Sequence, residues 1–384
     1  MTIPDPYAAR VEKLRVAMRA AGADVYLCDH AEMLYWLTGY TVSETFYRGA
    51  VIPLEGDPVW VLRAIDEVPC RKATWVEDVV AYPDDQDAHA QMAGTIARFS
   101  PKTIGADFTS FGFTVHTRDR LAALLPGTAF VDLPNSSNLL RAVKDAGEIR
   151  LMEKAARIGD GAMACVASSI VPGLRPRDAS AVAAAHYLTH GADDYWVGPI
   201  SISRRAASDG HDMGFLHATL AEDVLEDGDV LHVELVPRVS YYSCRFMRSV
   251  RIGTPTDEEV EVMERLVALQ DAQFAAIKPG AVARDVDAIL RGPLLKEGLR
   301  THFPNISGYL VGIYSKTPRS SDTTLSLHPG ADWRFEEGQT FHIYATARGL
   351  ALSETVVVTP DGCRRLGRTP RRILTAGETW SAKG

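Results

Sequence analysis

Apolar positions in the first third of the chain follow helical and strand periods in turn. Across residues 7–21 they recur at helical spacing up to Gly22, which predicts an amphipathic helix that ends at this glycine. Further apolar runs predict strands, one hairpin and one more helix, at residues 25–29 (strand), 50–63 (hairpin), 103–107 (strand), 117–125 (helix) and 129–133 (strand). This alternation predicts a compact α/β domain, and the polar segment 134–138 predicts a linker after it.

The rest of the chain carries longer elements. Helical periods span 146–170 and 257–276, and strand-like runs follow them at 228–251, 340–347 and 350–359. Helices followed by strands, twice over, predict an α+β domain built on an antiparallel sheet. We therefore expect two domains, an N-terminal one over residues 1–138 and a C-terminal one over residues 139–384.

A repeat relates two parts of the C-terminal domain. Residues 168–185 resemble residues 275–292, and each copy has a helix end, a Pro-Gly pair and an Arg-Asp pair before the next helix. Five identities are separated by 107 positions: Ile170/Ile277, Pro172/Pro279, Gly173/Gly280, Arg177/Arg284 and Asp178/Asp285. The repeat predicts an internal duplication with a pseudo-twofold axis, and a site between the two halves.

Composition narrows the class of protein. The 384 residues are 46% hydrophobic and 23% charged, as in ordinary globular domains, and the net charge of −8 disfavours a nucleic-acid partner. The sequence contains no run of about 18 apolar residues, so it predicts no membrane span. The first residues do not resemble a secretory signal. Five cysteines without CxxC spacing predict reduced thiols and a cytoplasmic protein.

Several motifs resemble the pita-bread family, which includes methionine aminopeptidase, prolidase, creatinase and ectoine hydrolase. They are the duplicated IxPG helices, GDVLHVEL, RSVRIG, SGYLVGI, FEEGQTFHIY and GLALSETVVVT. YLCDHAEMLYWLTGY and AVIPLEGDPVWVLR are similar to the smaller domain that creatinase and prolidase carry. The resemblance implies an α+β protein with a C-terminal pita-bread fold, internally duplicated, and a smaller N-terminal α/β domain of creatinase type.

The resemblance also locates the family's metal site. The family's peptidases hold two metals through Asp, Asp, His, Glu and Glu, and these positions fall here on Glu234, Arg245, Tyr309, Tyr344 and Ser353. One carboxylate remains, and an arginine would place a positive charge against the ions. We therefore expect neither a metal nor another cofactor.

Creatinase and ectoine hydrolase look similar in this respect, and both cleave C–N bonds that are not peptide bonds. The similarity to ectoine hydrolase is the closer one, through PLEGDPVW, HVEL, CRFMRSV and SLHPG. The chain departs from that pattern at KTPRSSDTT and at Ala351. The resemblance implies a metal-independent hydrolase whose substrate is a small zwitterionic nitrogen compound, either a cyclic amidine or a guanidino acid.

Proton transfer would then depend on side chains. Glu234, in the middle of a strand, is the candidate nucleophile or general base, and an ion pair with Arg245 or Arg248 is the structural alternative. His217 lies 11 residues before the glycine of GDVLHVEL, which is the spacing of creatinase's catalytic histidine. It is the candidate acid/base partner, and His211 is its alternative.

Arg245 is the candidate anchor for an anionic group of the substrate, because arginine binds carboxylates through two parallel hydrogen bonds. Tyr309 and Tyr344 would form the pocket walls. The alternative is that these three side chains fill an abandoned cavity.

Ser353 and Glu354 are neighbours on one predicted strand. Only one of them can face the pocket because side chains alternate along a strand. Glu354 is a candidate catalytic or orienting acid. His342 should share a face with Tyr344 and is a further candidate.

Tyr47 and Arg48 precede the predicted hairpin. The resemblance to creatinase implies a homodimer in which these two residues reach the partner's pocket, and a solvated loop is the alternative. The basic segment RRLGRTPRR predicts a solvated end or a dimer contact.

Three other functions remain open at this stage. The first is a lyase on the same fold, as in dimethylsulfoniopropionate-cleaving relatives, in which a base removes a proton next to a carboxylate. The second is an Xaa-Pro metallopeptidase, which the ligand count opposes. The third is a protein that binds a metabolite without turning it over.

Overall fold

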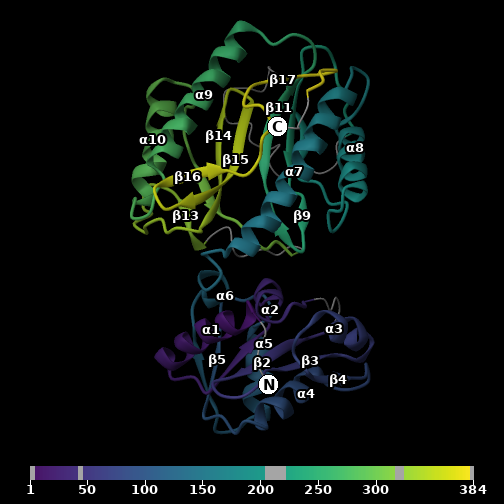
Figure 1. The fold of residues 1–384 in the computed structure, drawn as a ribbon, viewed down its shortest axis with the longest axis vertical. Coiled ribbons are helices and arrows are strands. Elements are labelled where there is room, and N and C mark those ends of the chain that lie inside the picture. The colour runs from purple at the N-terminus through teal and green to yellow at the C-terminus, as the bar shows by residue number, and fades with distance from the viewer. Residues whose placement is uncertain (1–4, 42–45, 204–221, 316–323, 381–384) are drawn as a thin grey trace. The chain divides into compact units, whose positions relative to one another are not determined.

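The computed structural model describes residues 5–41, 46–203, 222–315 and 324–380 (Figure 1). The chain divides into two compact units between Arg141 and Ala142. We call them the N-terminal unit and the C-terminal unit. Ser315 is the one described residue beyond this boundary that belongs to the N-terminal unit.

The N-terminal unit is built on a six-stranded mixed sheet with the strand order β4-β3-β2-β1-β5-β6. Strand β1 pairs antiparallel with β2 and parallel with β5. The elements are α1 (Tyr7–Ala21), β1 (Val25–Cys28), α2 (Ala31–Thr38), β2 (Gly49–Pro53), β3 (Val59–Arg63), η1 (Ala64–Asp66), α3 (Glu67–Ala73), β4 (Asp78–Tyr82), α4 (Ala88–Ala97), β5 (Thr103–Ala106), α5 (Val115–Leu124), β6 (Ala129–Asp132) and α6 (Ser136–Leu139). The helices and strands predicted over residues 7–133 are confirmed.

Helix α1 shows why the apolar pattern was informative. Val11, Leu14 and Met18 are fully buried on one face, and Gly22 ends the helix with a left-handed φ of 71°. The predicted linker differs from the structure, because residues 134–138 run into the short helix α6. The Asp107 carboxylate accepts hydrogen bonds from the backbone N–H groups of Asn135 and Ser137, at 3.2 and 3.0 Å. These bonds hold the segment close to the end of β5.

The C-terminal unit contains two curved sheets and two helix pairs. The sheet orders are β17-β11-β8-β7 and β13-β12-β14-β15-β16, with a separate β10-β9 ribbon. The elements are α7 (Ala146–Ser169), α8 (Pro176–Thr189), β7 (Ile200–Ser203), β8 (Val230–Leu235), β9 (Arg238–Val239), β10 (Tyr242–Ser243), β11 (Phe246–Arg251), α9 (Asp257–Ala276), α10 (Ala283–Lys296), β12 (Gly308–Leu310), β13 (Ser326–Leu327), β14 (Thr340–Ala347), β15 (Leu350–Thr359), β16 (Gly362–Arg365) and β17 (Leu374–Thr375). Figure 1 shows α7 and α8 at one side of this unit, and α9 and α10 at the other.

The duplication is visible in these helix pairs. Helices α7 and α9 end at Ser169 and Ala276, which are 107 positions apart, and α8 and α10 begin at equally spaced residues. The turn glycines Gly173 and Gly280 both adopt left-handed φ values, 91° and 85°. A residue with a Cβ would be strained at both turns, which explains why both copies keep a glycine.

The two sheets meet where β11 lies beside β15. The backbone N–H of Arg245 donates to the Thr355 hydroxyl at 2.8 Å, and the N–H of Ala351 donates to the Ser249 hydroxyl at 2.9 Å. One face of the second sheet packs Ile343 and other apolar side chains against α9 and α10. The opposite face of the joined sheets, which we call the inner face, carries the polar residues described next.

Among the described residues, no helix combines the length and the apolar character that a membrane crossing requires.

Candidate functional site

Glu234 and Arg245 form a buried ion pair on the inner face. Glu234, on β8, is fully buried, and its Oε1 accepts a hydrogen bond from Nε of Arg245. The Arg245 guanidinium also lies over the Tyr309 ring, 5.5 Å from its centroid. Within the described residues, Glu234 Oε2 is buried and has no hydrogen-bond partner. Among the described residues, this oxygen is therefore a buried acceptor that is not yet used.

Three aromatic rings lie next to this ion pair. The Tyr309 centroid is 5.0 Å from that of His342 and 6.0 Å from that of Tyr344, and the His342 and Tyr344 rings stack at 5.4 Å. His342 Nε2 is 2.7 Å from the Ser353 hydroxyl. The structure thus brings together Glu234 and the predicted binding residues, which are Arg245, Tyr309, His342, Tyr344 and Ser353.

The phenol of Tyr344 stays protonated in this environment. Burial raises its pKa to about 12. Its oxygen accepts a hydrogen bond from Nδ2 of Asn305 at 3.1 Å. Since the hydroxyl keeps its proton at neutral pH, Tyr344 can donate a hydrogen bond to a bound molecule.

His232 belongs to the same face, and the sequence reasoning did not select it. It lies two residues before Glu234 on β8, and both side chains are fully buried. Burial, followed by the charge of Arg245, lowers the pKa of His232 to about 3, so the imidazole is neutral near pH 7. The alternation of HVE along a strand was the signal that could have identified it.

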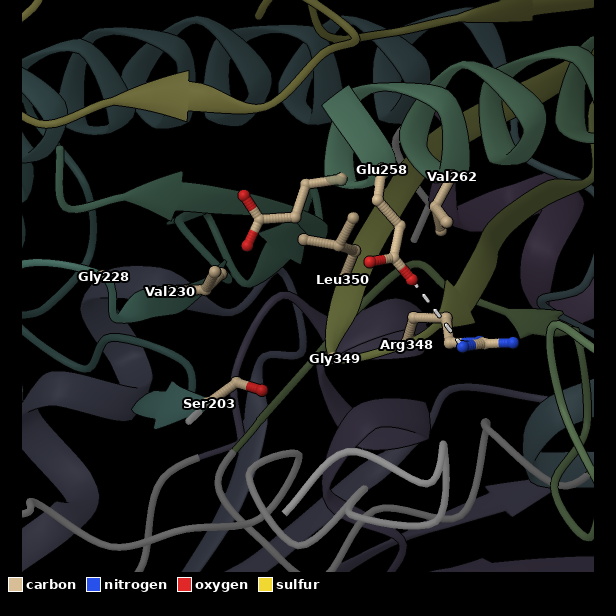
Figure 2. A pocket seen from close by; sticks show the side chains of 9 residues that line it. Ser203, Gly228, Val230, Glu258, Val262, Arg348, Gly349 and Leu350 are labelled. Atoms are coloured by element: carbon tan, nitrogen blue, oxygen red, sulfur yellow. Dashed lines mark ion pairs between the residues drawn. The ribbon is translucent and has the colours of Figure 1, made fainter. Parts of the chain in front are cut away.

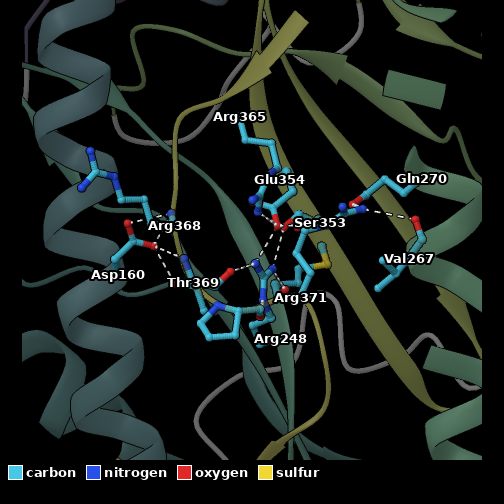
Figure 3. Close-up of polar contacts among 12 residues, drawn as sticks. Asp160, Arg248, Val267, Gln270, Ser353, Glu354, Arg365, Arg368, Thr369 and Arg371 are labelled. Carbon is cyan, nitrogen blue, oxygen red and sulfur yellow. Dashed lines mark hydrogen bonds and ion pairs between the residues drawn. The ribbon is translucent and has the colours of Figure 1, made fainter. Parts of the chain in front are cut away.

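Glu354 contacts a group of arginines (Figure 3). Its Oε1 accepts a hydrogen bond from Nη2 of Arg248 at 2.6 Å, and Arg365 and Arg371 approach it at 3.3 and 3.8 Å. Because neighbouring side chains on β15 point to opposite faces, Ser353 occupies the inner face and Glu354 does not. The structure therefore does not place Glu354 where a catalytic acid beside Glu234 would act.

Tyr47 and Arg48 are held within the N-terminal unit. The Tyr47 hydroxyl donates to Oδ2 of Asp29 at 3.1 Å, and its ring stacks on His89. The Arg48 guanidinium donates to the carbonyl oxygens of Thr41 and Asp29, each at 3.1 Å. Both side chains thus have partners in their own chain, and their reach into a partner's pocket stays a prediction.

His217, the candidate acid/base partner, and its alternative His211 both lie outside the described residues. Their place relative to Glu234 stays a prediction.

The described side chains on the inner face do not fit a pair of divalent metals. Of the five positions that, by resemblance, match the ligands of the family's peptidases, Glu234 supplies the one carboxylate, and Arg245 donates a hydrogen bond to one of its oxygens. Among the described residues, no three His, Cys, Asp or Glu side chains are grouped so that they could hold a metal ion. A guanidinium at this place would repel a cation.

A separate pocket lies beside the hairpin that joins β14 to β15 (Figure 2). An ion pair between Arg348 and Glu258, at 3.8 Å, lies on its wall. It is lined by Ser203, Gly228, Val230, Glu258, Glu259, Val262, Arg348, Gly349 and Leu350. None of the predicted site residues lines this pocket.

A duplicated sheet domain with a polar inner face, preceded in sequence by a small mixed α/β unit, defines the class of pita-bread hydrolases. Residues 150–360 match the profile of metallopeptidase family M24, and residues 10–143 match the creatinase/prolidase N-terminal domain. The chain belongs to metallopeptidase family M24 and carries that N-terminal domain. The predicted fold class is confirmed.

Relatives with two kinds of activity share this fold. Ectoine hydrolase from Halomonas elongata is 26% identical over 393 residues, which cover 96% of this chain and 97% of the relative. Xaa-Pro dipeptidase from Pyrococcus furiosus is 26% identical over 246 residues, 61% of this chain and 66% of the relative. The solved structure of an Xaa-Pro dipeptidase from Bacillus anthracis has a TM-score of 0.81 at 18% identity, covering 96% of this chain and 99% of that one. This chain is a hydrolase of that family.

Proposed function

We propose that this chain is a metal-independent hydrolase that cleaves a non-peptide C–N bond in a small zwitterionic nitrogen compound. The substrate is an ectoine-like cyclic amidine or a creatine-like guanidino acid. The carrying observation is the Glu234–Arg245 pair at two positions where, by resemblance, the family's peptidases bind metal. The similarity to ectoine hydrolase over nearly the full length of both chains favours the same chemistry.

The inner face suits this reaction. Glu234 Oε2 has no hydrogen-bond partner in the part of the chain that the structure describes, so it can take a proton from water or attack the amidine or guanidine carbon itself. Arg245 holds the other oxygen and fixes the direction of the carboxylate. When the C–N bond breaks, the leaving nitrogen gains a proton, and His217 is the proposed donor. The rings of Tyr309 and Tyr344 offer flat faces to a delocalised cation.

Xaa-Pro peptidase activity is the alternative that the other relatives favour. A peptidase of this family would need a metal pair, and the donor set described above does not fit one. A lyase would form products by elimination, to which no water has been added, and a binding protein would leave the ligand unchanged. Product analysis separates all of these functions.

We further propose a cytoplasmic homodimer. The five cysteines are free thiols in the structure, which suits a reducing compartment. The oligomeric state is read from light scattering of the full chain, and a monomer would contradict the proposed role of Tyr47 and Arg48.

The test is proton NMR of chelator-treated protein with ectoine, hydroxyectoine, creatine and dimethylsulfoniopropionate, with metal content measured on the same sample. We expect hydrolysis of one nitrogen compound, with the activity unchanged by the chelator. Glu234→Gln should abolish turnover, and Glu261→Gln, at an exposed position on α9, is the matched control. Stoichiometric metal, or activity that returns only with added metal, would refute metal independence. Intact compounds in every sample would refute the proposed substrates.

A further inference from the structure

Arg300 is a buried arginine in the loop between α10 and β12. It is 2% exposed. Its Nη2 donates to Oδ1 of Asn305 at 3.0 Å, its Nη1 donates to the Thr346 hydroxyl at 3.3 Å, and its guanidinium carbon is 4.1 Å from the centroid of the Phe303 ring. These partners are all neutral, so none of the described residues compensates the charge of Arg300.

Other buried arginines in the described part of the chain have carboxylate partners. Arg141 pairs with Glu32, Arg245 with Glu234, Arg248 with Glu354 and Arg251 with Glu259. Arg300 forms no ion pair among the described residues, and its Nε is buried without a hydrogen-bond partner. Burial lowers the pKa of Arg300, and no carboxylate contributes to the shift. A buried cation without a counter-charge is costly, so the fold has a reason to keep it only if an anion completes the arrangement.

The position of Arg300 connects it to the site. Thr346 lies two residues after Tyr344 on β14, so the two side chains share the inner face. Asn305 accepts from Arg300 through Oδ1 and donates to the Tyr344 oxygen through Nδ2, so one amide links the guanidinium to the phenol. Tyr344 in turn feels the charges of Arg245, Glu234 and Arg300. Arg300 therefore lies at the Tyr344 end of the cluster that contains Glu234.

We propose that Arg300, together with Tyr344, forms the subsite that binds the carboxylate of the substrate. Arg300 offers an uncompensated charge, and the protonated Tyr344 hydroxyl offers a neutral donor. Arg245 is less suited to this role, because Glu234 already neutralises it. The scissile C–N bond would then lie toward Glu234, at the other side of Tyr344. The identity of the carboxylate rests on the proposed function, but the existence of the anion subsite does not.

The first test uses acetate as the probe and the intact wild-type chain labelled with ¹⁵N-arginine. The Arg300 Nε–H resonance, assigned by correlation spectroscopy and checked with Arg300→Lys, is followed during titration with sodium acetate. Sodium chloride at equal ionic strength is the control. We expect a saturable shift of this resonance with acetate and none with chloride. No shift with acetate, or the same shift with both salts, would overturn the subsite.

The second test compares ectoine with its carboxamide, which has the same ring without the negative charge. Binding is measured by calorimetry, so turnover is not needed. Arg300→Met should weaken ectoine binding about tenfold to a hundredfold and leave carboxamide binding unchanged. The control is Arg265→Met, at a 41% exposed arginine of α9 that pairs with Glu297. It should not change the preference between the two ligands.

The outcomes separate the two proposals. Equal loss of affinity for ectoine and its carboxamide in Arg300→Met would mean that Arg300 supports the loop and does not bind the carboxylate. A shift of Arg300 by acetate without hydrolysis of any tested compound would refute the proposed substrates and retain the anion subsite.

Discussion

Removing either partner of the Glu234–Arg245 ion pair should lower the free energy of unfolding by several kcal/mol, because the remaining charge stays buried without its counter-charge. The Arg245 side chain is 8% exposed and that of Glu234 is 0% exposed. Glu234→Gln leaves a guanidinium without its counter-charge, and Arg245→Met leaves a carboxylate with no partner at either oxygen among the described residues. Each single change should lower the free energy of unfolding by about 3–5 kcal/mol, since a lone buried charge cannot be solvated.

The double variant Glu234→Gln/Arg245→Met removes both charges together. It should lose clearly less than the sum of the single variants, and the coupling free energy should be about 0.5–3 kcal/mol in favour of the pair. Chemical denaturation of the full chain measures these values, and hydrogen exchange of the β8 and β11 amides shows which unit opens.

Glu261→Gln serves here as the control as well, because a change at an exposed helix position should stay within about 0.5 kcal/mol of wild type. Two results would refute the reasoning. One is a pair of single variants as stable as that control. The other is a double variant whose loss equals the sum of the two single losses.

Three further predictions concern the same sheets. Because the pKa of His232 is about 3 in the fold and about 6.5 in the unfolded chain, unfolding takes up a proton in acid. His232 should therefore lower the unfolding free energy by about 1.4 kcal/mol for each unit by which the pH drops between about 6 and 4, and His232→Gln should change the slope of the wild-type curve by that amount. Arg248→Met should cost about 3 kcal/mol because Glu354 is 1% exposed, whereas Arg365→Met, at a 35% exposed side chain, should cost less than about 1 kcal/mol in the same assay. Ser353→Ala should keep kcat within about tenfold, and a loss of about a thousandfold would instead make that serine the nucleophile.

Much of the fold could be predicted from local pattern. The periodicity of residues 7–21 predicted α1, and the 107-residue offset of the two Pro-Gly turns predicted the duplication that is seen in the helix pairs. These features depend on neighbours in sequence, such as an apolar face at helical spacing or a glycine that must adopt positive φ. The segment 134–138 was expected to be a linker, but it leads into helix α6. The local pattern did not show this, because the N–H groups of Asn135 and Ser137 donate to the carboxylate of Asp107, about 30 residues away.

The candidate site was predictable in part. The motif positions identified Glu234, Arg245, Tyr309, Tyr344 and Ser353, and the structure brings them together. The run VVVT after Glu354 has no alternation, so the strand phase was undetermined until β15 paired with β14. That pairing sets Ser353 opposite Tyr344 and turns Glu354 toward Arg248.

The sequence by itself determined the class of fold and the duplication, and through the family resemblance it pointed to Glu234, Arg245, Tyr309, Tyr344 and Ser353 as candidate site residues. The tertiary structure alone decided which face a strand residue occupies, which carboxylate neutralises a buried arginine such as Arg245 or Arg248, and that Arg300 is buried with no carboxylate partner among the described residues. The physical reason is that burial and charge compensation depend on distance in space. A guanidinium and the carboxylate that it needs can be any number of residues apart in the chain, so their pairing becomes visible only when the sheets are assembled.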